Sequence, residues 1–215
     1  MAVKVNACCV IIAGSPDTDV NFIRQTVQSD DFVICADGGY SFAKAAGIVP
    51  QLIIGDFDSY ADILPSECEL IRLIPEKDDT DTLHCVNVAL ERGFRNFLLL
   101  GATGGRLDHS MANLCVLEYL YEHGAMGILL SPCERIELLC DSTQHYHGFR
   151  GKTFSVFPFG CNSVTLSYTG AKYPLVRDTL THSLSMGISN IFISNDASIT
   201  VHNGLALVII NMSKI

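Results

Sequence analysis

The first part of the chain alternates short, continuous apolar runs with stretches that carry apolar residues at helical spacing. The runs have strand length, and unbroken apolar character is typical of strands that are buried on both faces of a parallel sheet. Helical spacing occurs between them, for example at Val20, Ile23 and Val27. The runs span residues 7–13, 32–36, 52–54, 69–74, 96–100 and 125–130. This alternation predicts right-handed crossovers and a three-layer α/β domain with a parallel sheet.

The pattern changes after Ser131-Pro132, where runs of period two replace the helices. Turn signals such as His202-Asn203-Gly204 separate these runs. They span residues 136–140, 153–157, 164–168, 191–194, 198–201 and 205–211. We therefore expect an α/β domain over residues 1–132, followed by an all-β sandwich domain over residues 133–215.

Composition and charge narrow the class of protein. With 48% apolar and 17% charged residues, the 215-residue chain can bury a substantial core. A net charge of -9 argues against binding to nucleic acid or to an anionic membrane surface, since both would favour a basic patch. The apolar runs fall short of the roughly 20 residues that span a bilayer. The nine cysteines show neither C-x-x-C nor zinc-finger spacing, which favours a reduced, cytoplasmic protein.

Acidic residues follow several apolar runs at the point where each run ends. Asp56 and Asp58 come directly after residues 52–54, and strand alternation would send both to the same side, where they could face one hard cation. An Asp-rich turn is the structural alternative. The other acids in such positions are Asp37, Asp78, Asp81 and Asp108. Because the ligand crevice of an open α/β sheet lies outside the carboxyl ends of its strands, we expect these acids to converge on one site.

Three of these carboxylates suggest a magnesium site. Asp56, Asp58 and Asp78 would supply three oxygen ligands and leave the remaining positions of Mg²⁺ for water and phosphate, as in ATP chemistry. The first 133 residues hold 18 Asp and Glu against 8 Lys and Arg. A polyanion such as a nucleotide would therefore need a divalent metal in this part of the chain. Around Asp81, the alternative is helix capping, with Thr80 or Asp79 as the N-cap.

A glycine-rich stretch, Gly101 to Gly105, lies between a predicted strand and a predicted helix. Free backbone N–H groups and the helix dipole favour phosphate at such a position, and Arg106 adds a forked donor. The stretch is neither a Walker A loop nor a G-x-G-x-x-G fingerprint, and it could be merely a turn. Asp108 could be no more than an acid of the first helical turn, and His109 could be purely structural.

Six short segments carry a family resemblance that covers nearly the whole chain. They are Ala36-Asp37-Gly38-Gly39, Gly55-Asp56-Phe57-Asp58-Ser59, Lys77-Asp78-Asp79-Thr80-Asp81, Gly104-Gly105-Arg106-Leu107-Asp108-His109, Thr169 to Leu175, and Gly187-Ile188-Ser189-Asn190. In order and spacing they resemble the signature blocks of the thiamine pyrophosphokinase family. The resemblance implies transfer of a pyrophosphoryl group from ATP to the hydroxyethyl group of thiamine, giving thiamine diphosphate and AMP.

The resemblance also implies a role for each matching residue and a homodimer that shares its thiamine site. It implies that thiamine lies between the first domain of one subunit and the second domain of its partner. The Mg²⁺ ligands would be Asp56, Asp58 and Asp78. The ATP and thiamine side would be lined by Asp37, Asp81, Arg106 and Asp108, with Thr80, Gly104, Gly105 and His109 also binding substrate. Thiamine would be met from the partner chain by Tyr173, Ser189 and Asn190. An aromatic face suits a cationic thiazolium, and Asp37 and Asp81 are the candidates for the general base.

Two departures from the family pattern concern the thiamine side. Tyr173 stands where the animal enzymes have Trp, and Gly187-Ile188 stands where they have Ser-Thr. A smaller ring could still stack on thiamine, or Tyr173 could be a half-buried aromatic at a strand edge. These departures bear on thiamine affinity and on tolerance for analogues.

Two other functions would fit parts of the sequence. A Mg²⁺-dependent phosphohydrolase would use an Asp nucleophile in a D-x-D motif, but we find no partner Lys motif, and its product would be phosphate. A non-catalytic sensor of thiamine or nucleotide would have lost metal carboxylates, and all of them are present. The sequence therefore favours the kinase over both alternatives.

Overall fold

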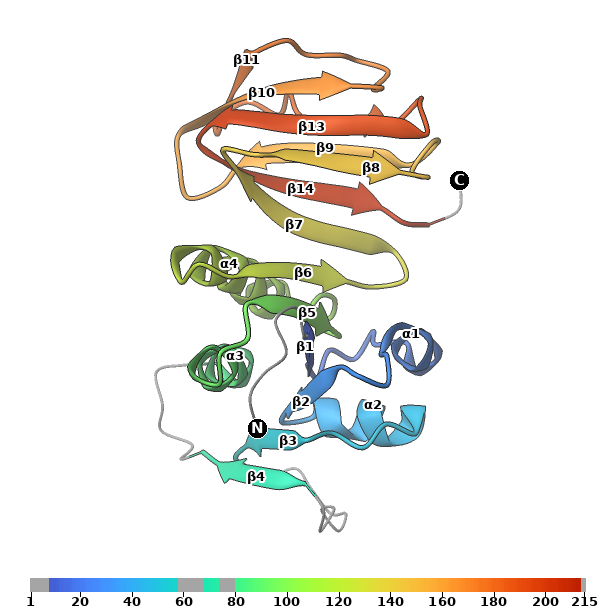
Figure 1. Ribbon diagram of the computed structural model, residues 1–215, viewed down its shortest axis with the longest axis vertical. Helices are drawn as coiled ribbons and strands as arrows, with labels where there is room; N and C mark the ends of the chain where they lie inside the picture. The colour runs from blue at the N-terminus through green and yellow to red at the C-terminus, as the bar shows by residue number, and fades with distance from the viewer. Residues whose placement is uncertain (1–7, 58–67, 74–79, 214–215) are drawn as a thin grey trace. The chain divides into compact units, whose positions relative to one another are not determined.

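The structure, a computed structural model, describes residues 8–57, 68–73 and 80–213 of the chain (Figure 1). The chain forms two compact units, Met1–Ser131 and Pro132–Ile215. The first unit is α/β with a parallel sheet and the second is an antiparallel β-sandwich, so the predicted fold class is confirmed. Among the described residues, no helix is long and apolar enough to cross a membrane.

The sheet of the first unit has the strand order β6-β5-β1-β2-β3-β4, with every neighbouring pair parallel. Its strands are β1 (Cys8–Ile12), β2 (Phe32–Ala36), β3 (Leu52–Gly55), β4 (Glu69–Arg72), β5 (Asn96–Leu100) and β6 (Met126–Leu130). The central strands are buried almost throughout, which explains why the sequence shows them as unbroken apolar runs.

Helices cover both faces of this sheet. They are α1 (Val20–Thr26), α2 (Gly39–Ala46), α3 (Asp81–Glu91) and α4 (Leu107–Glu122). Helices α1 and α2 lie on one side, and α3 and α4 lie on the other (Figure 1). On the first side, alternate residues of β1 and β2, such as Val10, Ile12 and Val33, pack with Ile23 of α1 and Ala43 of α2. This is the three-layer arrangement that the alternating pattern predicts.

The second unit contains two four-stranded antiparallel arrangements, β12-β9-β14-β7 and β11-β10-β13-β8. The first consists of β7 (Glu134–Cys140), β9 (Thr153–Pro158), β12 (Asn190–Ile191) and β14 (Leu205–Asn211). The second consists of β8 (Thr143–His147), β10 (Ser163–Thr169), β11 (Asp178–Thr181) and β13 (Asp196–Asn203). Burial alternates along β9 and β10, and the buried set, which includes Phe154, Leu166 and Ile199, forms one core.

Two strands of the second unit were not expected from the sequence, and one expected strand is shorter. Strands β8 and β11 each bury one large apolar side chain, Tyr146 and Leu180, so neither produces a visible period-two pattern. The strand expected over residues 191–194 is β12, of only two residues, Asn190–Ile191. The sequence does not reveal these short strands because pairing with neighbouring strands stabilises them, and not the β-propensity of their own residues.

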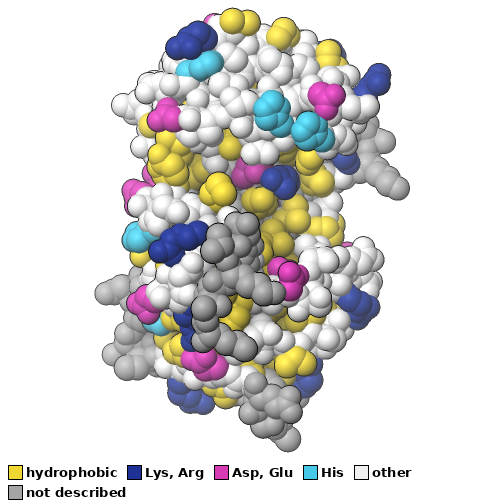
Figure 2. All heavy atoms as spheres, in the orientation of Figure 1, with side chains coloured by type: hydrophobic (Ala, Val, Ile, Leu, Met, Phe, Trp, Pro, Cys, Tyr) yellow, Lys and Arg dark blue, Asp and Glu magenta, His cyan; other side chains and the backbone are white. Residues whose placement is uncertain are grey.

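The surface agrees with the low basic content of the chain. On the face shown in Figure 2, the coloured Lys and Arg side chains are scattered and do not gather into one patch.

Candidate functional site

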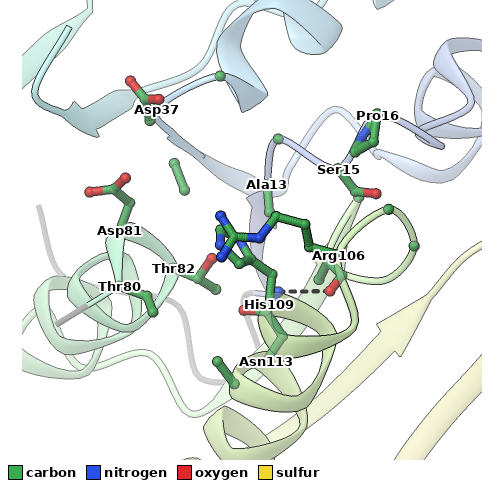
Figure 3. Close-up of a pocket in the computed structure, with 18 residues that line it drawn as sticks. Ala13, Ser15, Pro16, Asp37, Thr80, Asp81, Thr82, Arg106, His109 and Asn113 are labelled. Atoms are coloured by element: carbon green, nitrogen blue, oxygen red, sulfur yellow. Dashed lines mark hydrogen bonds between the residues drawn. The ribbon is translucent and has the colours of Figure 1, made fainter. Parts of the chain in front are cut away.

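A cavity of about 500 Å³ lies at the carboxyl ends of β1, β2 and β5. It is lined by the loops that follow these three strands and by the first turns of α3 and α4 (Figure 3). Its lining residues are Ala13, Gly14, Ser15, Pro16, Ala36, Asp37, Gly38, Thr80, Asp81, Thr82, Gly101, Ala102, Gly104, Gly105, Arg106, His109, Ala112 and Asn113. Many of these are Gly or Ala, whose small side chains leave room for a ligand.

The strand order explains why a cavity forms at this place. Strand β1 pairs with β2 on one side and with β5 on the other. The chain therefore leaves β1 in one direction and returns on its other side, which makes β1/β5 the topological switch point of the sheet. In open α/β sheets, ligands bind outside the carboxyl ends of the strands at such a point.

The glycine stretch Gly101 to Gly105 folds back against the loop that follows β1. Gly101, Gly104 and Gly105 have φ angles of 63°, 98° and 63°, a region that favours glycine. A Cβ on Gly104 would lie 2.6 Å from Oδ2 of Asp17, and one on Gly105 would lie 2.7 Å from Cγ of Pro16. The two loops thus pack with no space for side chains on these glycines.

Two backbone amides of this stretch are bonded within the protein, contrary to the expectation that its N–H groups are free. Gly104 N–H donates to Oγ of Ser110 at 3.2 Å, and Gly105 N–H donates to Oδ2 of Asp17 at 2.7 Å. The carboxylate of Asp17 holds an amide that a phosphate oxygen could otherwise use. The phosphate-binding groups of this loop are therefore to be sought first in the Arg106 side chain.

Arg106 lines the cavity, and Asp108 holds its guanidinium group. Nε of Arg106 donates to Oδ1 of Asp108 at 3.1 Å, and Nη2 donates to Oδ2 at 2.5 Å. The hydrogen bond from Arg106 lowers the pKa of the Asp108 carboxyl, which also accepts the backbone N–H of His109 at 3.0 Å. Asp108 is not among the lining residues of the cavity. Its contacts in the structure are with Arg106 and with the first turn of α4.

Two of the predicted acids line the cavity: Asp37 in the loop after β2, and Asp81 at the start of α3. Asp37 follows β2 with a positive φ of 40°, and its N–H donates to the carbonyl of Ile54 on β3 at 2.7 Å. A Cβ on Gly55 would lie 2.9 Å from Oδ1 of Asp37, so the glycine allows the carboxylate to lie against the end of β3. Asp81 begins α3, where the helix dipole favours a negative charge.

The magnesium hypothesis rests mainly on residues outside the described ranges. Asp56 is described and follows β3, but it does not line the cavity. Asp58 and Asp78 lie outside the described residues, as does Asp79. Within the described residues, no group of three His, Cys, Asp or Glu side chains could hold a metal ion. The carboxylates of Asp37 and Asp81, which line the cavity, are of the oxygen type that Mg²⁺ prefers.

Thr80 and His109 also line the cavity, and Thr80 has a structural task as well. Thr80 is the N-cap of α3, because its Oγ1 accepts the N–H of Leu83 at 3.2 Å. His109 lies in the first turn of α4 and borders the same space as Arg106 (Figure 3). The capping interpretation of the Thr80 region thus holds alongside its place in the site.

Sequence reasoning missed several lining residues and one supporting residue. Ser15 and Pro16 follow the first apolar run in a Gly-Ser-Pro turn, which by itself indicates no chemistry. Asn113 lies one turn beyond His109 on α4, where its buried side chain donates to the carbonyl of Ala102 at 2.7 Å. Its spacing of four from His109 is the signal that could have indicated it. Asp17 could be found only by knowing that the β1 and β5 loops are neighbours.

The predicted thiamine-side residues lie together in the second unit. The Tyr173 side chain is 58% exposed, whereas Asn190 is buried and forms hydrogen bonds with the backbone of Tyr173. Ser189 is exposed, has a φ of 58°, and its N–H donates to Oγ of Ser155 at 3.1 Å. Nζ of Lys172 lies 5.3 Å from the centroid of the Tyr173 ring, a cation–π distance. The ring is therefore an exposed aromatic platform that already attracts a cation.

Gly187 explains one departure from the family pattern. A Cβ at this position would lie 2.0 Å from the carbonyl oxygen of Val156, whose N–H in turn donates to the Gly187 carbonyl at 2.8 Å. Only glycine fits this backbone path. A chain with a larger residue here must follow a different path before Ser189.

The fold and the cavity define a class of protein. A parallel α/β unit presents an arginine, two carboxylates and a glycine-rich loop at its switch point, and an antiparallel β-sandwich follows it. This combination is typical of a two-domain enzyme that acts on a phosphorylated ligand.

Comparison with known proteins then identifies the family. Residues 23–129 match the model of the thiamin pyrophosphokinase catalytic domain, and residues 137–206 match the model of the thiamin pyrophosphokinase vitamin B1 binding domain. The chain belongs to the thiamine pyrophosphokinase family.

Individual relatives agree with this assignment. The thiamine pyrophosphokinase of Bacillus subtilis is 27% identical over 205 residues, which cover 93% of this chain and 96% of the relative. The crystal structure of the B. subtilis protein has the same fold, with a TM-score of 0.84 and 24% identity over 96% of this chain and 100% of that chain. A thiamin pyrophosphokinase structure from Geobacillus thermodenitrificans matches with a TM-score of 0.82 and 25% identity, covering 96% of this chain and 98% of that one.

Proposed function

We propose that this chain transfers the pyrophosphoryl group of ATP to the hydroxyl group of thiamine, giving thiamine diphosphate and AMP. The observation that carries the proposal is the switch-point cavity, which Asp37, Asp81 and Arg106 line in a chain that matches both domain models of the family. The reaction is one bond exchange. The thiamine hydroxyl oxygen bonds to the β-phosphorus of ATP, the bond from that phosphorus to the oxygen bridging to the α-phosphorus breaks, and AMP leaves with that oxygen.

The residues of the cavity supply positioning and charge. Arg106, held by Asp108 through two hydrogen bonds, presents its remaining donors to phosphate oxygens. The hydroxyl proton of thiamine passes to a carboxylate, for which Asp37 and Asp81 are the two candidates. In phosphoryl-type transfers, orientation and neutralisation of charge account for most of the rate.

Magnesium is part of the proposal and is supported by the oxygen donors around the cavity. Asp56, Asp58 and Asp78 would hold the ion. When bound, it would offset the negative charge of the ATP phosphates in a first unit that is rich in acids. The protein's own groups would orient the two substrates around it.

We also propose that the chain is a cytoplasmic homodimer in which thiamine lies between the first domain of one subunit and the Tyr173 side of its partner. The support is the second unit's exposed apolar side chains, which an aqueous monomer would leave unpartnered. They are Tyr173, Val176, Leu184, Met186, Ile188 and Ile193. Light scattering coupled to size-exclusion chromatography tests the dimer, and a mass of one chain at micromolar concentration would contradict it.

The test of the activity is an analysis of nucleotide products with ATP, Mg²⁺ and thiamine, comparing the unsubstituted chain with Asp56→Asn. We expect AMP and thiamine diphosphate to appear together and to be lost in the variant and on addition of a chelator. Free phosphate would support a phosphohydrolase in its place. Thiamine binding without turnover would indicate a sensor.

A further inference from the structure

Tyr173 lies at the end of a short antiparallel pairing between residues 171–173 and 190–192. Ala171 and Phe192 form an isolated antiparallel bridge, and the N–H of Lys172 donates to the carbonyl of Ile191 at 2.8 Å. In a regular ladder of this register, Tyr173 and Asn190 would face each other as a pair without backbone hydrogen bonds between them. Ser189 has a left-handed φ of 58°, which turns the chain away at this point.

The side-chain amide of Asn190 supplies hydrogen bonds that the backbone of its own strand would not give to Tyr173. Its Oδ1 accepts the N–H of Tyr173 at 3.0 Å, and its Nδ2 donates to the carbonyl of Tyr173 at 2.7 Å. Oδ1 also accepts the N–H of Ile191 at 2.9 Å. An amide side chain carries a donor and an acceptor in the same arrangement as a peptide group, so it can pair with both backbone groups of one residue.

Burial separates the roles of the two residues. Asn190 is 5% exposed, and both polar ends of its amide are used within the protein, whereas Tyr173 is 58% exposed. Burial leaves a ligand little access to the Asn190 amide, but the Tyr173 ring is accessible as it stands.

We infer that Asn190 is a positioning residue: its amide holds the Tyr173 backbone so that the ring stands as a fixed platform for an aromatic, cationic ligand. This inference rests on the proposed function, in which that ligand is thiamine. A platform that is already ordered loses less conformational entropy on binding, so the effect is expected in affinity for the ligand stacked on it.

The chain offers a specific optical test because it contains no tryptophan. Tyr173→Trp places a single tryptophan at the platform, and the Asn190 bonds go to the backbone of residue 173, so the new side chain does not remove them. In this background, Asn190→Ala removes all three bonds. Asn190→Asp retains the acceptors and removes the donor to the Tyr173 carbonyl. Asn211→Ala is the matched control, since Asn211 also accepts a backbone N–H, that of Ser213, at 2.9 Å.

We expect the fluorescence anisotropy of the introduced tryptophan, measured without ligand, to fall in both Asn190 variants and to be unchanged in Asn211→Ala. In the chain that retains Tyr173, we expect Asn190→Ala to raise the KM for thiamine about tenfold, with the KM for ATP unchanged and a much smaller effect on kcat. Should Asn190→Ala fail to fold, judged by circular dichroism, Asn190→Asp carries the same test.

Unchanged anisotropy in the Asn190 variants would overturn the inference, even if the KM for thiamine rose, because Asn190 would then act by direct contact. A fall in anisotropy with no change in the KM for thiamine would overturn it as well. Absence of thiamine turnover in the unsubstituted chain would instead refute the proposed function, and the ligand-free anisotropy would still decide whether Asn190 orders the platform.

Discussion

At the scale of single residues, the Arg106–Asp108 ion pair is exposed and is expected to affect ligand binding more than the stability of the fold. The two side chains are 70% and 64% exposed, and pairs of this kind contribute little to folding. Asp108 instead constrains a long, flexible side chain at the edge of the cavity, and the hydrogen bond from Arg106 lowers the pKa of the Asp108 carboxyl. Its effect should therefore be seen in ligand binding.

The first prediction follows from this difference. Arg106→Gln should raise the KM for ATP between about tenfold and about a hundredfold, the usual loss for charge-assisted hydrogen bonds, and should leave the melting temperature nearly unchanged. Steady-state kinetics at saturating thiamine measure the first effect and calorimetry the second. The control is Arg92→Gln, since Arg92 makes a similar ion pair with Glu69 at 2.7 Å and does not line the cavity. An unchanged KM for ATP in Arg106→Gln would remove Arg106 from the site.

A second prediction at this scale concerns Asp108. Asp108→Asn keeps one acceptor for Arg106 but removes the charge, so the KM for ATP should rise in the same direction as in Arg106→Gln and by a smaller factor. The double variant should be little worse than Arg106→Gln alone, because Asp108 acts through Arg106. Additive effects in this double-mutant cycle would show that Asp108 contacts substrate independently.

At the scale of elements, the close approach of α2 to β1 depends on one glycine of an adjacent pair. A Cβ on Gly39 would lie 1.9 Å from the carbonyl oxygen of Ile12, a clash with backbone on a buried strand. A Cβ on Gly38 would meet nothing closer than Cα of Gly14 at 3.8 Å, which is an ordinary contact. Both glycines belong to the Ala36-Asp37-Gly38-Gly39 segment, but only Gly39 is required by packing.

We therefore predict that Gly39→Ala lowers the free energy of unfolding by about 3 kcal/mol, the upper range for overpacking, and that Gly38→Ala changes it by less than about 0.5 kcal/mol. Urea denaturation followed by circular dichroism measures both. Since Gly38 has a helical φ of -50°, no backbone strain opposes the alanine there. Equal destabilisation by the two substitutions would contradict the packing argument.

The element scale also shows how far the sequence could predict this molecule. The sequence was sufficient to predict the buried strands and three of the cavity residues, Asp37, Asp81 and Arg106. Parallel strands end at the same edge of a sheet, and the chain places polar groups there. The hydrogen-bond partners of Gly105 and Tyr173 could not be predicted. Asp17 and Asn190 lie far from them in the sequence, and only the folded structure brings these loops together. Strands such as β8 were not predicted because their burial depends on the strands with which they pair.

At the scale of the whole molecule, the buried cysteines couple stability to pH. Cys9 and Cys35 lie fully buried in the parallel sheet, and burial raises the pKa of both thiols. Burial also raises the pKa of the half-buried Cys8 to about 11. A thiol whose pKa is raised by folding stabilises the fold fully below its unfolded pKa of about 8.5, and this contribution is lost as the pH rises above that value.

The last prediction is that the free energy of unfolding falls between pH 8.5 and pH 10, because the unfolded chain releases thiol protons that the folded chain retains. Each such thiol contributes a slope of up to about 1.4 kcal/mol per pH unit. Urea denaturation at a series of pH values, in the presence of a reductant, gives the slope. Cys9→Ala combined with Cys35→Ala should make it shallower by the share of two thiols, whereas Cys115→Ala, at an exposed position of α4, should not. A slope that is the same in all three chains would assign the alkaline loss of stability to groups other than the buried thiols.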